Sequence, residues 1–440
     1  MEKFTKLGLS NDVVSVLKES GFTEPSEIQE KTIPIALKGK DIIGGSATGS
    51  GKTLAFAAPI IENLKHGEGI QAIILTPTRE LADQVATSIR HFSKNKRLKT
   101  LAVYGGVNID QQIRRLSTTD ILVGTPGRIL DHLNRRTLRL SDIKILVLDE
   151  VDRMFDMGFS RDVEHIINEC PVDRQTMMFS ATISSEIDYL AQKYSQNPVE
   201  VSVKSYIDHS KLTQIYYDTP SNKKFSLLVH LLEEEKSKLV MVFCSTRRNV
   251  DLVAENLVRI GIHARAIHGG LDQKKRSRIL KEFHGSGVGV LVCTDVAARG
   301  LDIKGVSHVY NYDLPTNSSD YIHRIGRTAR AGKEGKAINI LSSRDYENFS
   351  EVTLDESLKI DPKPLPLFKN VRMQMRQRGN KPSFSRARPS HRARPSGNSP
   401  RRHSGGPKRK TRKKGADRSS VRKMSLSKSR QKKGMKARRR

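Results

Sequence analysis

The 440-residue sequence predicts an α/β protein: two tandem parallel-sheet domains followed by a disordered, basic C-terminal tail. The domains are predicted by short β-branched runs that alternate with longer helical patterns, because strands of a parallel sheet are buried on both faces and read as continuous apolar runs. The tail is predicted by its charge. Between Val371 and Arg440 there are 27 Lys or Arg and one acid, Asp417, so this segment carries +26 of the net charge of +31.

The apolar runs form two series along the chain. We expect the strands of the first domain at 72–75, 121–123, 143–148 and 176–179, and those of the second at 238–243, 264–267, 288–292, 306–310 and 337–341. The predicted organisation is a first domain over 1–204, a linker over 205–214, a second domain over 215–360 and the tail over 361–440. The tail is rich in Arg, Lys, Ser, Pro and Gly, and this composition buries too little apolar surface to offset the entropy lost on ordering.

The cysteines and the hydropathy bound the class of protein. Cys170, Cys244 and Cys293 form no CxxC pair and no cluster with histidine, so we expect buried, reduced thiols rather than a zinc site or a disulfide framework. The N-terminus lacks an apolar signal segment, and no apolar run approaches the roughly 18 residues that span a bilayer. The sequence therefore predicts a soluble protein of a reducing compartment, with no membrane partner.

Residues 46–56, SATGSGKTLAF, are the first candidate site. They depart from the phosphate-loop pattern GxxxxGK(S/T) at its first position, which is Ser46. In a flexible loop, GSGKT alone would be weak evidence, because the same residues also occur in simple turns. Here it follows an apolar stretch and precedes a helix start at Leu54, so backbone N–H groups can converge on a phosphate at a helix N-terminus. We predict that Lys52 holds the β- and γ-phosphates and that Thr53 binds Mg²⁺. The other nucleotide-binding residues expected in the loop are Thr48, Gly49, Ser50 and Gly51.

A pair of carboxylates follows the run 143–148. Asp149 is placed to bind the metal through water, and Glu150 can accept a proton from the attacking water. The alternative is a solvated acidic turn. Polar groups also follow the other predicted strands of the first domain, at 77–82, 125–128 and 180–182. Because ligands bind outside the carboxyl ends of parallel strands, these groups are expected to share one edge of the sheet.

Together these motifs resemble the DEAD-box family of ATP-dependent RNA helicases, from about Phe4 to about Leu341. Residues 21–29, GFTEPSEIQ, are similar to the family's Q motif, with Phe4 as the upstream aromatic residue. The resemblance implies two RecA-like domains, with ATP and Mg²⁺ as cofactors. It also implies that Phe22 and Gln29 bind ATP, with Gln29 reading the adenine edge.

The second domain carries the remaining motifs of the family. Residues 242–246 resemble motif IV, 273–276 the QxxR element, 293–302 motif V and 323–330 motif VI. The resemblance implies that Arg327 and Arg330 stabilise the charge of the γ-phosphate in the transition state, as arginines supplied from a second domain do. Gly300 and Asp302 are similar to the residues that meet the ribose and phosphate side of the nucleotide. The implied catalytic set is Lys52, Asp149, Glu150, Arg327 and Arg330.

The resemblance also implies RNA contacts along one edge of each domain. Glycines, hydroxyls and arginines suit a sugar-phosphate backbone and contain little chemistry for reading bases, so binding is expected to be largely independent of sequence. The implied RNA-binding residues are Pro77, Thr78, Arg79, Gly105, Gly106, Thr125, Gly127, Arg128, Ser245, Thr246, Gly269, Arg276 and Thr294. The residues expected to couple the nucleotide and RNA sites are Asp152, Ser180, Thr182 and His323.

Two positions depart from the family's pattern. Val151 stands where the motif with Asp149 and Glu150 has alanine, and its side chain makes no bond in the expected chemistry. Ser46-Ala47 stands where alanine-glutamine is usual, which affects loop geometry rather than catalysis. No catalytic position is missing, so we expect an active enzyme.

The predicted function is an RNA-stimulated ATPase that couples hydrolysis to local, sequence-independent unwinding or remodelling of RNA duplexes and ribonucleoprotein complexes. A clamp that holds RNA without separating strands would carry the same motifs, and a DNA-directed motor is a further alternative. The tail is expected to bind structured RNA or ribonucleoprotein through salt-dependent attraction to phosphates. Residues 407–414, PKRKTRKK, also resemble a nuclear import signal, but any RNA-binding tail has this basic pattern. We therefore interpret the tail as an RNA anchor and expect a cytoplasmic location, with a nuclear or nucleolar one as the alternative. The sequence does not identify protein partners.

Overall fold

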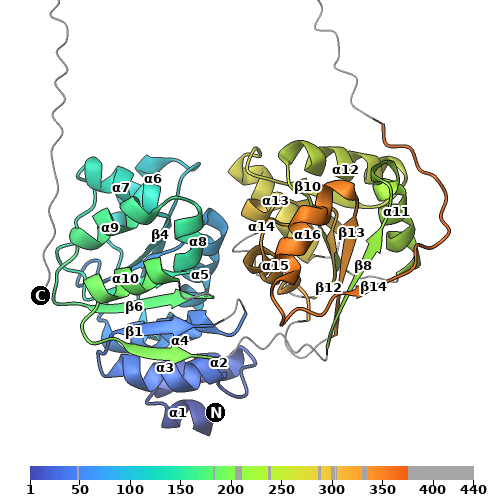
Figure 1. Ribbon diagram of the computed structural model, residues 1–440. Coiled ribbons are helices and arrows are strands. Elements are labelled where there is room, and N and C mark those ends of the chain that lie inside the picture. Colours follow the sequence, from blue (N-terminus) through green and yellow to red (C-terminus); the bar gives the residue numbers. More distant parts are fainter. Residues whose placement is uncertain are drawn as a thin grey trace, which may run out of the picture. The chain divides into compact units, whose positions relative to one another are not determined.

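The computed structural model describes both domains and the segment that follows them. The described residues are 1–46, 49–181, 184–203, 211–235, 239–285, 289–298, 303, 305–329 and 334–374. Each domain is a parallel sheet with helices on both faces (Figure 1). The predicted α/β class with two tandem parallel-sheet domains is confirmed. Within these residues no helix combines the length and the apolar composition that a membrane span requires.

The described part of the first domain contains a seven-stranded sheet with the order β3-β4-β2-β5-β6-β1-β7. Neighbouring strands pair in parallel. The strands are β1 (Ile42–Gly45), β2 (Ala72–Leu75), β3 (Thr100–Val103), β4 (Ile121–Gly124), β5 (Ile145–Asp149), β6 (Gln175–Ser180) and β7 (Val199–Ser202). The carboxyl ends of parallel strands meet at one edge, so the loops that follow the central strands lie together.

Helices cover both faces of this sheet. They are α1 (Glu2–Lys6), α2 (Asn11–Glu19), α3 (Glu27–Leu37), α4 (Lys52–Asn63), α5 (Arg79–Phe92), α6 (Ile109–Leu116), α7 (Pro126–Asn134), α8 (Val151–Asp156), α9 (Ser160–Asn168) and α10 (Ser185–Tyr194), with a 3₁₀ turn η1 at Lys94–Lys96. Alternate strand residues feed two cores. Ile145 and Val147 of β5 pack with α1–α5, whereas Leu146 and Leu148 pack with α6–α10. Burial on both faces is the reason that these strands are continuously apolar.

The first turns of these helices carry local sequence signals. Ser26 and Gln29 form a capping box at the start of α3, and the Thr78 hydroxyl accepts a hydrogen bond from the Leu81 N–H at 3.3 Å at the start of α5. Pro126 is the first residue of α7. Proline is favoured there because an N–H at that position would have no acceptor within the helix. These residues fix where the three helices begin.

The second domain repeats the arrangement of the first. In its described residues a seven-stranded sheet has the order β10-β11-β9-β12-β13-β8-β14, again with parallel pairs. The strands are β8 (Leu212–Asp218), β9 (Leu239–Phe243), β10 (Ala264–Ile267), β11 (Val290–Cys293), β12 (Val306–Asn311), β13 (Gly335–Leu341) and β14 (Asp361–Pro362). Matching the two orders makes β8 equivalent to β1, β9 to β2, β10 to β3 and β12 to β5.

Helices and short turns connect these strands. They are α11 (Lys224–Glu234), α12 (Arg247–Arg259), α13 (Gln273–His284), α14 (Asp295–Ala298), α15 (Ser318–Ile325), α16 (Tyr346–Thr353), η2 (Ser221–Lys223) and η3 (Ser343–Asp345). Strand β9 shows the same two-sided burial, with Val240 and Val242 in one core and Met241 and Phe243 in the other.

Residues 361–374, which we call the strap, correct the predicted start of the tail. They pack against the second domain and do not belong to a tail that begins at 361. Strand β14 pairs with β8, and the Phe368 ring stacks on His230 with centroids 6.0 Å apart. The Val371 N–H donates to the Ser226 hydroxyl at 2.9 Å, and the Gln374 N–H donates to Asn256 Oδ1 at 2.8 Å. The predicted disordered tail over 375–440 lies outside the described residues.

Strands β2 and β10 have the predicted bounds, and the other predicted strands differ by one or two residues at an end. Strands β3, β7, β8 and β14 were not predicted, and β1 was expected only as the apolar stretch before the phosphate loop. In β7 only Val201 is fully buried, so its sequence lacks a continuous apolar run. Strand β8 begins at Leu212, so the predicted linker over 205–214 extends too far, and residues 204–210 lie outside the described part.

The three cysteines are free and buried, as predicted. Burial raises the pKa of the Cys170 thiol to about 12 and also raises the pKa values of Cys244 and Cys293. A thiol is nucleophilic only as the thiolate, so these cysteines are packing residues and not reactive groups.

Candidate functional site

The phosphate-loop sequence leaves β1 and enters α4. The Ser46 N–H donates to the Ser180 carbonyl at 2.9 Å, which ties the start of the loop to the end of β6. Lys52, the first residue of α4, is 7% exposed, and its ammonium donates to the Ser46 carbonyl at 2.9 Å. Ser50 Oγ donates to Ser46 Oγ at 3.0 Å. The loop therefore folds back on itself beside a buried cation at a helix N-terminus, where a phosphate is favoured.

Gln29 of α3 lies directly against this loop. Its Nε2 donates to the Gly51 carbonyl at 3.1 Å, while its Oε1 accepts from the Ser26 N–H at 3.0 Å. Gly51 has φ +97°, and a Cβ added there would also collide with the Gln29 amide and lie 2.8 Å from Ser26 Oγ. Only glycine fits this position, because L residues rarely adopt that φ and the space is filled. The residue predicted to read adenine and the predicted phosphate loop are thus brought together.

Phe22 belongs to an aromatic group beside α3. Its ring packs edge-to-face against Phe4, with centroids 6.5 Å apart, and against Phe92 at 5.9 Å. Phe4 is fully buried and Phe22 partly so. This packing fixes the chain that precedes Gln29.

Asp149 is the last residue of β5, and Glu150 follows it at the same edge of the sheet. Asp149 is 3% exposed, and its Oδ1 has no hydrogen-bond partner among the described residues. Burial raises the pKa of the Asp149 carboxyl, and the Lys52 ammonium opposes that shift. A buried carboxylate of this kind is stable only beside a cation. Glu150 is 8% exposed and has φ +54°, an uncommon conformation for a non-glycine residue, so its backbone turns sharply between β5 and α8.

Asp152 connects the carboxylate loop to the loop after β6. Its Oδ2 accepts a hydrogen bond from the Ala181 N–H at 3.2 Å. Ser180, the last residue of β6, is buried and bonded to the phosphate loop as described above. Val151 is fully buried and packs in the core with α6–α10, so this departure from the family's alanine is accommodated by packing.

Arg79 covers a pair of glycines in the first domain. It is the first residue of α5, directly after the Thr78 cap, and a Cβ added to Gly105 would lie 3.1 Å from its Nη2. Gly106 has φ +83°, and a Cβ there would collide with the same guanidinium. Arg79, Gly105 and Gly106, which were predicted to contact the RNA backbone, are therefore adjacent in space. Pro77, Thr125 and Gly127 follow β2 and β4 at the same edge.

Arg128 is held by two residues that the sequence did not predict. Its Nη1 donates to Gln112 Oε1 at 3.0 Å, and that oxygen also lies 3.0 Å from His132 Nε2. The Gln112 amide in turn donates to the Tyr104 carbonyl at 3.1 Å, immediately before the glycine pair. Gln112 and His132 are buried. One buried network thus connects the guanidinium of Arg128 to the loop that follows β3.

The second domain places the same residue types after the equivalent strands. Thr246 caps α12 by accepting from the Asn249 N–H at 3.1 Å, as Thr78 caps α5. Arg247 then lies over Gly269, whose added Cβ would be 3.3 Å from its Nη2, as Arg79 lies over Gly105. Ser245 and Thr294 follow β9 and β11, and Arg276 is a mostly buried residue of α13. The two domains thus repeat one arrangement, in which a threonine caps the helix and the next arginine lies over a glycine.

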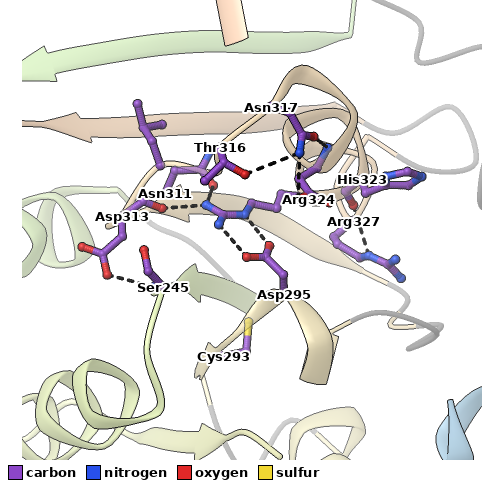
Figure 2. A network of polar contacts seen from close by, with 12 residues as sticks. Ser245, Cys293, Asp295, Asn311, Asp313, Thr316, Asn317, His323, Arg324 and Arg327 are labelled. Carbon is purple, nitrogen blue, oxygen red and sulfur yellow. Dashed lines mark hydrogen bonds and ion pairs between the residues drawn. The ribbon is translucent and has the colours of Figure 1, made fainter. Parts of the chain in front are cut away.

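A buried arginine organises the loops of the second domain (Figure 2). Arg324 of α15 is 2% exposed, and its Nε and Nη2 donate to the two carboxylate oxygens of Asp295 at 2.5 and 2.7 Å. Its Nη1 donates to Asn311 Oδ1 at 3.0 Å and to the Asp313 carbonyl at 2.6 Å. Arg327 follows α15, and its Nε donates to the His323 carbonyl at 3.3 Å. The helix that carries the motif VI residues is therefore fixed to the loops after β11 and β12.

Comparison with known proteins agrees with this geometry. The family model for DEAD/DEAH box helicases matches residues 26–190, and the helicase conserved C-terminal domain matches residues 223–332. A curated protein of Limosilactobacillus reuteri, "ATP-dependent RNA helicase CshA", is 45% identical over 353 residues, which cover 80% of this chain and 71% of that protein. The chain belongs to the DEAD-box family. It is an ATP-dependent RNA helicase, and RNA is its partner.

Two further relatives of this DEAD-box helicase are informative. The CshA protein of Geobacillus kaustophilus is 44% identical over 377 residues, covering 82% of this chain and 80% of that protein. The solved structure of Saccharomyces cerevisiae Dbp5 bound to RNA and ADP BeF3 has a TM-score of 0.76 and 30% identity, covering 83% of this chain and 96% of that chain. The family therefore accounts for both domains and leaves the basic tail unmatched.

Several predicted site residues of the helicase lie outside the described part of the chain. They are Thr48, Thr182, Gly300, Asp302 and Arg330. The described site residues divide into a nucleotide group around Lys52, Gln29 and Asp149, and one backbone-binding edge in each domain. Their roles remain predictions.

The residues that the sequence reasoning missed hold the motifs in place. Gln112, His132, Asp295, Asn311 and Asp313 contact predicted site residues or the buried Arg324. One signal was available for Asp313, because it follows the apolar run at 306–310 as Asp149 follows the run at 143–148. For Gln112 and His132 no local signal existed, since their partners lie 16 to 20 residues away along the chain.

Proposed function

We propose that this helicase hydrolyses ATP at the loop between β1 and α4 and uses the cycle to separate short RNA duplexes without reading their sequence. The observation that carries the proposal is the buried Asp149 carboxylate, which has an oxygen without a partner among the described residues and whose pKa, raised by burial, is lowered in turn by the charge of Lys52, the buried cation of the phosphate loop. In this role Lys52 holds the β- and γ-phosphates, and Gln29 selects adenine from its place against Gly51. Glu150 accepts the proton of the attacking water.

The residues present fit Mg²⁺. Among the described residues no group of three or more His, Cys, Asp or Glu side chains is arranged to hold a metal by itself. Mg²⁺ is ordinarily bound by one or two carboxylates together with substrate phosphates and water, and it takes oxygen ligands. Asp149 supplies a carboxylate with an unpartnered oxygen, and Thr53 supplies a hydroxyl in the first turn of α4. When bound, the metal neutralises charge on the phosphates as it develops.

The second domain contributes the positive charge that hydrolysis needs. We assign Arg327 and Arg330 to stabilising the γ-phosphate in the transition state, with Gly300 and Asp302 at the ribose and phosphate side. Because these residues come from a different domain from Lys52 and Asp149, ATP favours a closed arrangement of the two domains. Asp152, Ser180, Thr182 and His323 are the proposed links between nucleotide state and RNA binding; the hydrogen bond from Ala181 N–H to Asp152 supports this role.

RNA binds along the carboxyl edges of the two sheets. The repeated cap, arginine and glycine arrangement in the two domains supports backbone recognition, because hydroxyls, backbone N–H groups and guanidinium groups are ligands for phosphate. Closure bends one strand, so a short duplex loses base pairs, and release of phosphate reopens the domains. The Dbp5 structure with RNA and ADP BeF3 supports the use of this fold for both ligands. The basic tail adds sequence-independent attraction to RNA, and we place the enzyme in the cytoplasm.

The first experiment is steady-state ATP hydrolysis by the full chain without nucleic acid, with single-stranded RNA and with DNA of the same sequence. We expect RNA alone to stimulate hydrolysis and Glu150→Gln to reduce it by about 10²- to 10⁴-fold through loss of the general base. A labelled short duplex is then used to measure strand release. Hydrolysis without strand release would favour the clamp, and equal stimulation by DNA would contradict RNA selectivity.

A further inference from the structure

Asp313 follows β12 at the carboxyl edge of the second sheet, and its backbone is held from both sides. Its N–H donates to the Phe243 carbonyl at 3.1 Å, which attaches it to the end of β9. Its carbonyl accepts from Arg324 Nη1 at 2.6 Å. Arg324 is itself buried and bonded to both carboxylate oxygens of Asp295. These contacts fix the backbone of Asp313 at this edge of the sheet.

The carboxylate of Asp313 points at the loop that carries Ser245 and Thr246 (Figure 2). Its Oδ2 accepts from the Ser245 N–H at 2.9 Å and from the Asn249 side-chain amide at 3.2 Å. Thr246 lies between these two donors in sequence and caps α12. A carboxylate that accepts a backbone N–H makes a charge-assisted hydrogen bond, which is shorter and stronger than a neutral one. The loop therefore has an anionic anchor on one side.

A buried cation stabilises this carboxylate. Lys224 is 4% exposed, and its Nζ lies 2.9 Å from Asp345 Oδ2 and 3.9 Å from Asp313 Oδ1. The Lys224 ammonium also lies 5.2 Å from the centre of the Tyr312 ring. The other oxygen of the carboxylate thus remains available for the Ser245 loop.

The cluster lies at the place in the second domain that is equivalent to the phosphate loop and Asp149 in the first. Lys224 is the first residue of α11 after β8, and Lys52 is the first residue of α4 after the equivalent strand β1. Asp313 follows β12, and Asp149 ends the equivalent strand β5. In the first domain the lysine and the carboxylate border a phosphate loop. In the second, Asp345 supplies an internal anion to the lysine, and Asp313 faces the loop with Ser245.

We propose that Asp313 is a positioning residue for RNA binding, which holds the Ser245–Thr246 loop in the conformation that contacts the RNA backbone. The inference rests on the proposed RNA contacts of Ser245 and Thr246. The carboxylate touches neither ATP nor RNA in this role. It acts through the backbone N–H of Ser245 and the side chain of Asn249, so its removal loosens the loop without changing the groups that bind phosphate.

The test compares Asp313→Asn and Asp313→Ala with the unchanged full chain in RNA-stimulated ATP hydrolysis. The RNA concentration for half-maximal rate is expected to rise roughly 3-fold in Asp313→Asn and roughly 10-fold in Asp313→Ala, because a charge-assisted hydrogen bond to the loop is weakened and then lost. The rate at saturating RNA and the ATP concentration for half-maximal rate are expected to stay within about twofold. A purely structural role would lower the saturating rate together with the unfolding temperature.

Asp345→Asn is the matched control. It removes the nearer partner of Lys224 and disturbs the same buried ion cluster, but Asp345 makes no bond to Ser245 among the described contacts. We expect it to lower the unfolding temperature at least as much as Asp313→Asn, with an RNA requirement within about twofold of the unchanged chain. An equal rise in both variants would overturn the proposal.

Arg79→Ala separates this inference from the proposed function. If Arg79→Ala raises the RNA requirement and Asp313→Ala does not, only the positioning role is wrong. If neither variant changes it, the proposed RNA edge is itself wrong and the positioning role falls with it.

Discussion

At the scale of single residues, the site depends on charged groups that are buried inside each domain. Asp149 has an oxygen without a partner among the described residues and feels the charge of the buried Lys52, whereas Arg324 is enclosed by Asp295, Asn311 and Asp313. Burying a charge is costly unless a partner compensates for it. Arg324 has protein partners for its guanidinium, whereas one oxygen of Asp149 has none among the described residues. This difference is the one expected between a network that holds loops in place and the proposed ligand site.

The sequence predicted the candidate ligand-binding residues better than the residues that hold them in place. Lys52, Asp149 and Arg128 belong to motifs whose spacing along the chain is itself the signal. Gln112 and His132 are ordinary helix residues in sequence, and only packing brings them to Arg128. A contact made between distant segments has no local pattern, so such residues appear only in the structure.

His132 gives a testable pH dependence. Burial lowers its pKa, with the Arg128 guanidinium adding to the effect, while Asp131 opposes it and Arg135 lowers it further. The unfolded chain then binds a proton more readily than the folded one, so the stability from neutral His132 is present above about pH 6.5 and is lost as the pH falls below that value. We expect His132→Gln to show a smaller fall in unfolding temperature between about pH 7.5 and about pH 5.5 than the unchanged chain.

His284→Gln, at an exposed position, is the control and should behave as the unchanged chain does. An equal pH dependence in all three proteins would contradict the assignment.

At the scale of elements, the agreement between predicted and observed strands follows burial. Strand β2 was predicted with its bounds because it is a short, fully buried apolar run, and β10 was predicted with its bounds although Arg265 within it is exposed. Strand β7 is largely exposed and strand β14 is two residues long, so neither leaves an apolar run. The strap was assigned to the tail, although the basic composition that predicts the tail begins only at about residue 371. Its order comes from contacts with α11 and α12, more than 100 residues earlier.

The strap is predicted to be part of the second domain energetically. Phe368, Val371 and Met373 pack against the core that includes α11 and α12. A chain ending at residue 374 should unfold at the temperature of the full chain, whereas a chain ending at residue 360 should unfold roughly 5 to 15 °C lower, through loss of about 2 to 4 kcal/mol of apolar burial. Thermal unfolding followed by circular dichroism measures both. Phe368→Ala in the full chain is the matched point change and should account for part of the shift. Equal unfolding temperatures for the two truncated chains would show that the strap contributes nothing.

At the scale of the whole molecule, the charge is divided between a nearly neutral pair of domains and a strongly basic tail. Removing residues 375–440 takes away 26 of the 27 Lys or Arg counted from Val371, because Arg372 remains. Asp417 is removed as well, so the chain loses a net charge of +25. The residues predicted to bind ATP and the RNA backbone all belong to the two domains. We therefore expect the tail to act on RNA affinity and not on the chemistry. Because the strap packs on the second domain, the truncation that isolates the tail ends at residue 374.

The tail's contribution is predicted to depend on salt. Each phosphate neutralised by Lys or Arg releases counterions, so affinity falls steeply as salt rises. At about 50 mM salt the chain ending at 374 should need at least roughly 10-fold more RNA for half-maximal ATP hydrolysis than the full chain, and at about 200 mM the ratio should approach one. The saturating rate should be the same for both chains, because the catalytic residues are unchanged. A ratio that does not change with salt would show that the tail recognises RNA by specific contacts instead of phosphate charge. A lower saturating rate would show that it takes part in the ATP cycle.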